Sequence, residues 1–347
     1  MCELFFVFML ENIEEFNKYV LTVDNSANYW MVRTMGGEYY EEFVENNFVA
    51  IGYNDILLRE INSFDGEERD IVHALKSIVA ERHEEVLMPG HVASQLVRFC
   101  RTIKKGDILV VPGWGSCEIS ICRVTGEVYE EPNVRDDNGL CPFMKRLPVE
   151  ILKSMNRRAL SPKAQLMFNS RHPISDISDY AVYIDNICHD YYCKEDETHI
   201  VLNIETQEDV TMPAFYNLQK LFDIAEAFCK ENGISGEAKD VVMKVQMESP
   251  GILHFISKNK NFLFLIGILV LFINGGGLKI DRGSFKLDLS TDGILRNISE
   301  FMDRNTDREL RESIKASMDS LQIKTPEDFQ KAMINLYKVQ NENRKEY

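Results

Sequence analysis

One tryptophan lies in a glycine-rich turn. Trp114 stands between two glycines in the run Pro112-Gly113-Trp114-Gly115. A large apolar ring in a turn is costly unless other atoms cover it or a ligand uses it. Such a ring can stack on a planar heterocycle, and stacking contributes about 1–3 kcal/mol per nucleobase. Trp114, with Pro112 at the start of the turn, is therefore our leading candidate for a binding residue.

Two arginines are candidates for the charged part of such a site. Arg33 follows a short apolar run, and Arg98 lies in a predicted helix. A guanidinium group can bind a phosphate or a base edge through two parallel hydrogen bonds. Gly36, Gly37 and Gly52 would let the backbone approach a ligand closely. Arg98 is equally compatible with a simple ion pair to one of the many carboxylates.

The residue patterns of common enzymes are weak in this chain. Asp281, Lys286 and Asp288 lie close together in sequence, yet they lack the acid-x-Lys step of nucleases that bind Mg²⁺. Glu237 and Lys239 have that step, but no strand-like run leads into it. The phosphate-loop, His-Glu-x-x-His and Gly-x-Ser-x-Gly motifs do not occur in the sequence. We expect no catalytic residues and no cofactor, with a nuclease kept as an alternative.

Composition limits the possible partners. The 347 residues carry a net charge of −16, which argues against nonspecific coating of nucleic acid. It leaves room for a small pocket that binds one base. Of the eight cysteines, only Cys188 and Cys193, with His189 between them, are spaced like metal ligands, and no second such pair accompanies them. We therefore expect free thiols and no metal. We also expect a cytoplasmic protein, because residues 1–10 lack the basic start of a signal peptide.

Periodicity predicts a series of helices and strands in the first half of the chain. Helices are expected at residues 11–23, 67–84 and 91–103, and strands at 29–33, 49–53, 107–111, 117–128 and 147–151. Lys104-Lys105-Gly106 is a typical helix end, with basic residues before a glycine. Mixed helices and strands of this kind indicate an α+β fold.

The order and spacing of these features resemble a known family. The matching segments are Tyr29–Arg33, Gly36-Gly37, Val49–Tyr53, Leu96–Phe99, Lys105–Pro112, Ile121–Tyr129 and Arg158-Ala159-Leu160-Ser161. Together they resemble the PUA-like fold in its EVE/YTH branch, as found at the N-terminus of Mrr-type restriction proteins. The resemblance covers about residues 27–190. It implies a β-barrel with flanking helices that reads modified bases in nucleic acid.

The resemblance also implies a binding pocket at the rim of the barrel. Trp30 at the start of the first strand, Tyr53 after Ile51-Gly52, and Trp114 would supply its aromatic walls. Tyr53 departs from the family pattern, because related domains usually carry tryptophan there. Trp30 is equally compatible with a place in the barrel core.

The second half of the chain is not recognised. We expect a leading helical segment at 1–26, the reader domain at 27–192, a connecting helical segment at 193–235 and an α+β module at 236–347. Within these we predict a helix at 211–229, extended chain at 241–257, a hairpin at 278–289 and two closing helices.

The run from Phe262 to Ile273 is the most apolar in the protein. As a helix, its 12 residues would span about 18 Å, against about 30 Å for the hydrocarbon core of a membrane. A buried helix or an interface between identical subunits is favoured. Membrane insertion stays open, because lysines and an arginine flank the run.

Taken together, the sequence predicts a non-enzymatic protein that binds a modified or flipped base in DNA or RNA. The resemblance implies a role in bacterial restriction and antiviral defence. Expected partners are a second copy of the chain, through 262–273 and the closing helices, and a nuclease or helicase. Two alternatives stay open: a membrane-associated effector that senses a small nucleotide, and a subunit of a restriction nuclease.

Overall fold

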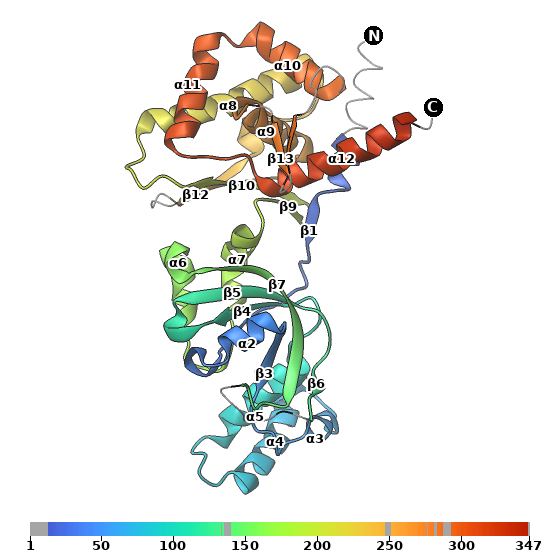
Figure 1. The fold of residues 1–347 in the computed structure, drawn as a ribbon, viewed down its shortest axis with the longest axis vertical. Helices are drawn as coiled ribbons and strands as arrows, with labels where there is room; N and C mark the ends of the chain where they lie inside the picture. The colour runs from blue at the N-terminus through green and yellow to red at the C-terminus, as the bar shows by residue number, and fades with distance from the viewer. Residues whose placement is uncertain are drawn as a thin grey trace. The chain divides into compact units, whose positions relative to one another are not determined.

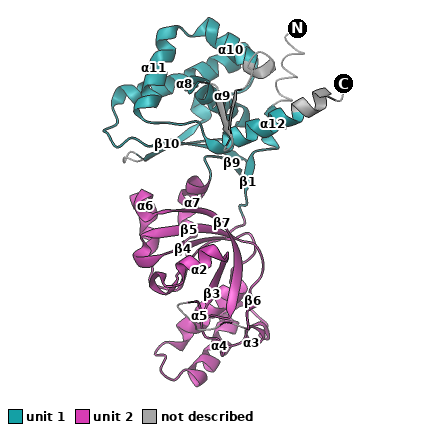
Figure 2. Cartoon of the chain, viewed as in Figure 1, with its two compact units in different colours: residues 1–25, 189–347 teal, residues 26–188 magenta. Residues whose placement is uncertain are grey.

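The chain divides into two compact units. The computed structural model describes residues 13–132, 134, 140–246, 251–275, 277–280, 283–286 and 293–345. Unit 1 combines residues 1–25 and 189–347, and unit 2 is residues 26–188 (Figure 2). The expected reader domain, 27–192, covers nearly the same residues as unit 2. The segments 1–26, 193–235 and 236–347, which were expected as separate parts, share unit 1.

Unit 2 is built on one curled sheet that forms a half-barrel (Figure 1). The strand order is β3-β7-β5-β4-β2-β8, with β6 paired to β7, and β2 and β4 are parallel while the other pairs are antiparallel. The strands are β2 (Tyr29–Val32), β3 (Phe48–Ile51), β4 (Ile108–Pro112), β5 (Glu118–Val124), β6 (Tyr129–Glu130), β7 (Lys145–Asn156) and β8 (Ile174–Asp176). The long strand β7 pairs with β3 through its first residues and with β5 through its last, which gives the sheet its curl.

Helices cover both faces of this sheet. The α-helices are α2 (Tyr40–Glu45), α3 (Leu58–Asn62), α4 (Glu68–Arg82), α5 (Pro89–Val97) with a π-helical turn η2 (Arg98–Thr102), α6 (Pro162–Gln165) and α7 (Ala181–Cys188). Short 3₁₀ turns are η1 (Met35–Gly37), η3 (Trp114–Ser116), η4 (Arg157–Ala159), η5 (Leu166–Asn169) and η6 (Ser178–Tyr180). Helix α4 follows its predicted stripe, because Ile71, Leu75 and Val79 are all buried.

Alternation along the strands separates two cores. On β2, Trp30 and Val32 join a core with α2, α4 and α5, whereas Tyr29 and Met31 join a second core with α6 and α7. Since successive strand residues point to opposite faces, this pattern requires a sheet covered on both sides. The placement of Trp30 in the first core bears directly on the candidate site.

Unit 1 contains a five-stranded sheet of order β1-β9-β10-β12-β11. Its strands are β1 (Leu21–Val23), β9 (Tyr191–Lys194), β10 (Glu197–Ile204), β11 (Val242–Gln246) and β12 (Gly251–Ser257), and a separate hairpin joins β13 (Gly277–Ile280) to β14 (Gly283–Lys286). The helices are α8 (Met212–Glu231), α9 (Lys260–Ile273), α10 (Gly293–Asn305), α11 (Arg308–Ser320) and α12 (Glu327–Lys345), with a short turn η7 (Ala238–Asp240). Strands β1 and β9 are parallel and the remaining pairs antiparallel.

The apolar run forms the central helix of unit 1. Helix α9 packs on β10 and β12 and against α8 and α11, and its residues from Phe262 to Ile273 are buried except for a partly exposed Phe272. The unit itself thus buries most of this run, and the expected interface between subunits through 262–273 stays a prediction. Among the described residues, no helix is both long and apolar enough to cross a membrane.

Two predicted elements differ from the observed ones. The leading helix was expected to reach residue 23, but Leu21–Val23 forms strand β1, which pairs with β9. The chain was expected to close with two helices, whereas α10, α11 and α12 are three. Asp307 separates α10 from α11, because its side chain accepts a hydrogen bond from the N–H of Leu310 and caps the new helix.

Candidate nucleic-acid interface

Two tight turns meet at one edge of the sheet of unit 2. Because β2 and β4 are parallel neighbours, the loops that follow them emerge at the same edge. Turn η1 follows β2 and turn η3 follows β4. A Cβ atom added to Gly37 would lie 2.2 Å from Cα of Trp114, so the two backbones are in direct contact. The predicted residues Gly36, Gly37, Pro112 and Trp114 are thus brought together.

The backbone of both turns is held in an unusual conformation. Met35 and Ser116 have positive φ angles of 50° and 55°, which non-glycine residues rarely adopt. Gly36, Gly37 and Gly115 also have positive φ angles. Strained backbone of this kind clusters at functional sites, where interactions with the surrounding structure hold it in place.

A hydrogen-bond network, buried except at its outer end on Ser154, fixes these turns to the sheet. The hydroxyl of Thr34 donates to the carbonyl of Pro112 over 2.6 Å. The hydroxyl of Tyr40 lies 2.8 Å from that of Ser120, which in turn lies 2.7 Å from that of Ser154. The ring of Tyr40 also lies directly against Gly113. The backbone beneath the exposed side chains is therefore rigid.

The side chains that the turns carry point into solvent. Trp114 is 76% exposed and Met35 is 63% exposed. An indole ring normally has most of its surface covered in a folded protein. A free ring on a fixed backbone is a platform on which a planar group can stack with little ordering cost.

Two arginines lie close to this platform. The backbone N–H of Arg157 donates to the carbonyl of Cys117, the residue that directly follows η3, over 2.8 Å. Its guanidinium lies 4.5 Å from the ring centre of Phe168, and an amino group of Arg33 donates to the carbonyl of Phe168 over 2.9 Å. Burial, together with the positive charge of Arg157, lowers the pKa of Arg33. Arg33 and Arg157 are thus neighbouring cations.

Each of these arginines has a buried donor without a partner. The Nε atoms of Arg33 and Arg157 are buried and make no hydrogen bond within the described part of the chain. An unpartnered buried donor costs about 1–3 kcal/mol, and more when the group is charged. These two Nε atoms are closed to solvent, so an anion such as a phosphate would have to bind the part-exposed remainder of the two adjacent guanidinium groups.

Trp30 does not belong to this surface. It is only 6% exposed, and its indole N–H donates to the carboxylate of Asp107 over 3.0 Å. The same carboxylate group also accepts from the backbone N–H groups of Asn28 and Lys104. Trp30 is therefore a core residue that joins β2 to the start of β4, and the expected three-ring sandwich is not formed.

Tyr53 and Gly52 lie at the other end of β7. The carbonyl of Tyr53 accepts from the amine of Lys145, the first residue of β7, whereas η3 lies beside the last residues of that strand. Twelve strand residues span about 36 Å along the chain. The Tyr53 ring is half-buried against His83, and Gly52 lies under the ring of Phe143. These residues are not part of the platform.

Arg98 also lies away from the platform. It begins the π-helical turn after α5, and its Nε lies 4.0 Å from a carboxylate oxygen of Glu68 on α4. This is the ion-pair interpretation that the sequence left open. Exposed pairs of this kind contribute about 0–1 kcal/mol.

Sequence reasoning missed Arg157 and Met35. The adjacent arginines Arg157 and Arg158 in an acidic chain were a usable signal, since local basic residues mark anion sites. Met35 carried no such signal, because its exposure follows from a positive φ angle that the sequence does not show.

The residues considered for a metal site or a nuclease site are not brought together within the described part of the chain. Within the described residues, no group of three or more His, Cys, Asp and Glu side chains could hold a metal ion. Asp281 and Asp288 lie outside the described residues, and Glu237 and Lys239 form an exposed ion pair with each other. Comparison with models of protein families, with curated proteins and with solved structures gave no match to this chain.

Proposed function

We propose that unit 2 is a PUA-like domain of the EVE/YTH type that binds an unpaired or flipped, modified base in nucleic acid. The base would stack on Trp114, and the adjoining phosphate would bind Arg157 and Arg33. One observation carries the proposal: a solvent-exposed indole on a hydrogen-bonded double turn lies next to two adjacent cations, Arg33 and Arg157. A role in restriction or antiviral defence follows from the sequence resemblance.

Binding through a small number of local cations suits the charge of this protein. With a net charge of −16, the chain repels a polyanion at long range, so affinity must come from short-range contacts. Stacking on one ring contributes about 1–3 kcal/mol. The contact between Trp114 and the base would supply most of that affinity, and the arginines would set the position of the backbone.

The proposal differs from the sandwich that the sequence suggested. With Trp30 in the core and Tyr53 beyond the far end of β7, the base has one aromatic partner. Met35, exposed on the facing turn, supplies the second apolar contact. Selectivity for a modified base would then depend on how its added group contacts this thioether side chain.

The test is binding of short single-stranded oligonucleotides that carry one modified cytosine or adenine, measured by fluorescence anisotropy. Trp114→Ala is expected to weaken binding by about 5- to 150-fold. Tyr216→Ala is the matched control, because Tyr216 is 65% exposed and lies in unit 1. Unchanged affinity of Trp114→Ala would exclude the stacking platform.

Arg157→Gln tests the phosphate contact separately. We expect weaker binding to every oligonucleotide and a salt dependence whose slope is smaller by about one charge. A control at Arg158, which is exposed and adjacent, shows whether the effect belongs to the position of Arg157 or to positive charge in general. Equal effects of Arg157→Gln and Arg158→Gln would contradict a specific phosphate site.

A further inference from the structure

The two turns that carry Trp114 and Met35 form an open platform. Trp114 is 76% exposed and Met35 is 63% exposed. Among the described residues, a Cβ atom added to Gly36 would meet nothing within 4 Å, and one added to Gly115 would meet only the sulfur of Cys117, at 3.8 Å. The space around both turns is therefore open, and a base stacked on Trp114 would keep most of its polar edge in water.

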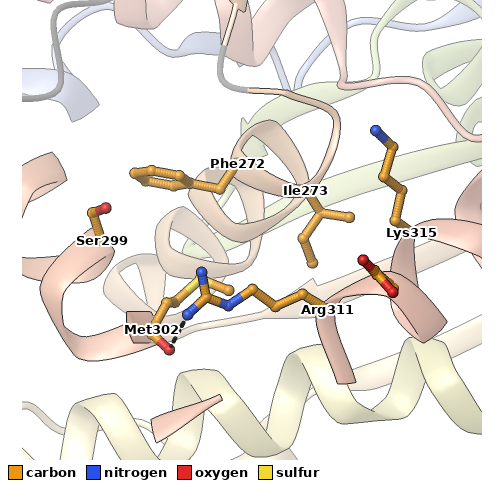
Figure 3. Close-up of a pocket in the computed structure, with 7 residues that line it drawn as sticks. Phe272, Ile273, Ser299, Met302, Arg311 and Lys315 are labelled. Carbon is orange, nitrogen blue, oxygen red and sulfur yellow. Dashed lines mark hydrogen bonds between the residues drawn. The ribbon is translucent and has the colours of Figure 1, made fainter. Parts of the chain in front are cut away.

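A hollow built from several elements looks different in this same protein. The hollow of about 190 Å³ at the end of α9 is surrounded by side chains from three helices, among them Phe272 of α9, Met302 of α10 and Arg311 of α11 (Figure 3). The platform consists of two neighbouring turns, and the side chains of Trp114 and Met35 project from them into solvent. A group bound on the platform is therefore held by few side chains.

Proteins that extract a base from a duplex depend on enclosure. They hold the extruded base in a close-fitting pocket that stacks on its faces and hydrogen-bonds its polar edge, which offsets the pairing and stacking lost in the duplex. That loss lowers affinity by roughly 100- to 1,000-fold. One stacking contact raises affinity by about 5- to 150-fold. Stacking on Trp114 therefore at most balances the cost of extraction and leaves no net affinity for a paired base.

The charge of the protein disfavours a duplex further. The chain carries a net charge of −16, and a duplex has about twice as many phosphates per unit length as a single strand. The duplex is therefore repelled more strongly at long range. Arg33 and Arg157 would contact the phosphate next to the stacked base in both cases, so they do not reverse this preference.

We infer that the ligand of the platform is a base that is already unpaired, in a single strand, a loop or an open end, and that unit 2 does not extract bases from a duplex. This inference rests on the proposed function and selects between its two forms, the unpaired and the flipped base. The nucleic acid must then be opened before this protein binds it, by a reaction that separates the strands or removes one of them.

The test uses the full chain and a labelled strand of about 12 nucleotides that carries a single methylated adenine. Fluorescence anisotropy compares this strand alone, in a duplex that pairs the methylated base, and in a duplex that leaves it unpaired as a bulge. The two duplexes carry nearly the same charge, so they isolate the cost of pairing. We expect the paired duplex to bind roughly 100-fold more weakly than the bulged one, and the single strand to bind at least as tightly as the bulge.

Trp114→Ala should weaken binding of the single strand by about 5- to 150-fold and leave the weak binding of the paired duplex unchanged. Leu87→Ala is the matched control, because Leu87 is a 97% exposed apolar residue of unit 2 in the connection between α4 and α5, and it should change neither affinity. Equal affinity for the paired and the bulged duplex, both lowered by Trp114→Ala, would overturn the inference and leave the proposed function with a flipped base. Unchanged affinity of Trp114→Ala for the single strand would remove both.

Discussion

A methyl group placed between the turns η1 and η3 of unit 2 should show whether their close contact is needed for stability, for binding, or for both. At Gly37, φ is +112° and an added Cβ would lie 2.2 Å from Cα of Trp114 and 2.3 Å from its backbone nitrogen. These are backbone atoms, so no change of rotamer can relieve the overlap. At the preceding Gly36, φ is +74° and an added Cβ would meet nothing within 4 Å. Gly37→Ala and Gly36→Ala therefore form a matched pair.

The expected costs follow from this geometry. A residue with a Cβ in the left-handed region costs about 1–2 kcal/mol, and that is the whole penalty at Gly36. At Gly37 the overlap adds about 1–3 kcal/mol, as overpacking does in a core. We therefore expect Gly36→Ala to lose about 1–2 kcal/mol and Gly37→Ala about 2–5 kcal/mol of the unfolding free energy of unit 2.

The chain offers a selective probe for this measurement. Its two tryptophans, Trp30 and Trp114, both lie in unit 2. Because Trp30 is buried and Trp114 is already exposed, the change in fluorescence on urea denaturation reports mainly the unfolding of the core around Trp30. The full-length protein can thus be used without separating its units.

Binding of a modified oligonucleotide is the second measurement. Under conditions in which both variants are folded, Gly36→Ala should bind nearly as the original chain does, whereas Gly37→Ala should bind weakly, because η3 has to move away from η1. Equal stability of the two variants would refute the close contact of the turns. Full binding by a folded Gly37→Ala protein would show that the position of Trp114 does not matter.

Two further predictions concern buried charges. Burial and the neighbouring Asp328 raise the pKa of Asp190 to about 6. Protonation of Asp190 should therefore stabilise the fold by up to about 3 kcal/mol below pH ~4, and this gain is lost as the pH rises through about 6. A carboxyl ¹³C NMR titration that places the pKa of Asp190 at or below 4 would contradict this prediction. Lys145 is fully buried and donates to the carbonyls of Tyr53 and Ile56. Lys145→Met should therefore cost about 1–3 kcal/mol, seen as a lower urea midpoint of tryptophan fluorescence, and an unchanged or higher midpoint would rule out this role.

The elements that the sequence predicted well are those with a strong local pattern. Ile71, Leu75 and Val79 follow one another at helical spacing, and the helix they predict is observed as α4. The run 262–273 is apolar on every side, which is typical of a helix buried in a core, and α9 is such a helix. Local spacing carries this information without knowledge of distant partners.

The features that could not be predicted from the sequence depend on residues far away in the chain. Strand β1 has three residues, and it is a strand because β9 offers it hydrogen bonds from about 170 residues later. Trp30 became a core residue because Asp107 accepts its N–H, which two isolated segments could not reveal. The position of Arg157 beside η3 likewise follows from pairing of β5 with β7.

Unit 2 is an insertion within the sheet of unit 1. Leu21 and Tyr192 are partners in the parallel pair β1–β9, so the polypeptide leaves this sheet and returns to it at adjoining strands. During synthesis on the ribosome, β1 is made early but has no partner until residues beyond 190 have emerged. Unit 2 is by then fully synthesised and able to fold first, so the closure of β1 on β9 has to wait for the whole of the inserted unit.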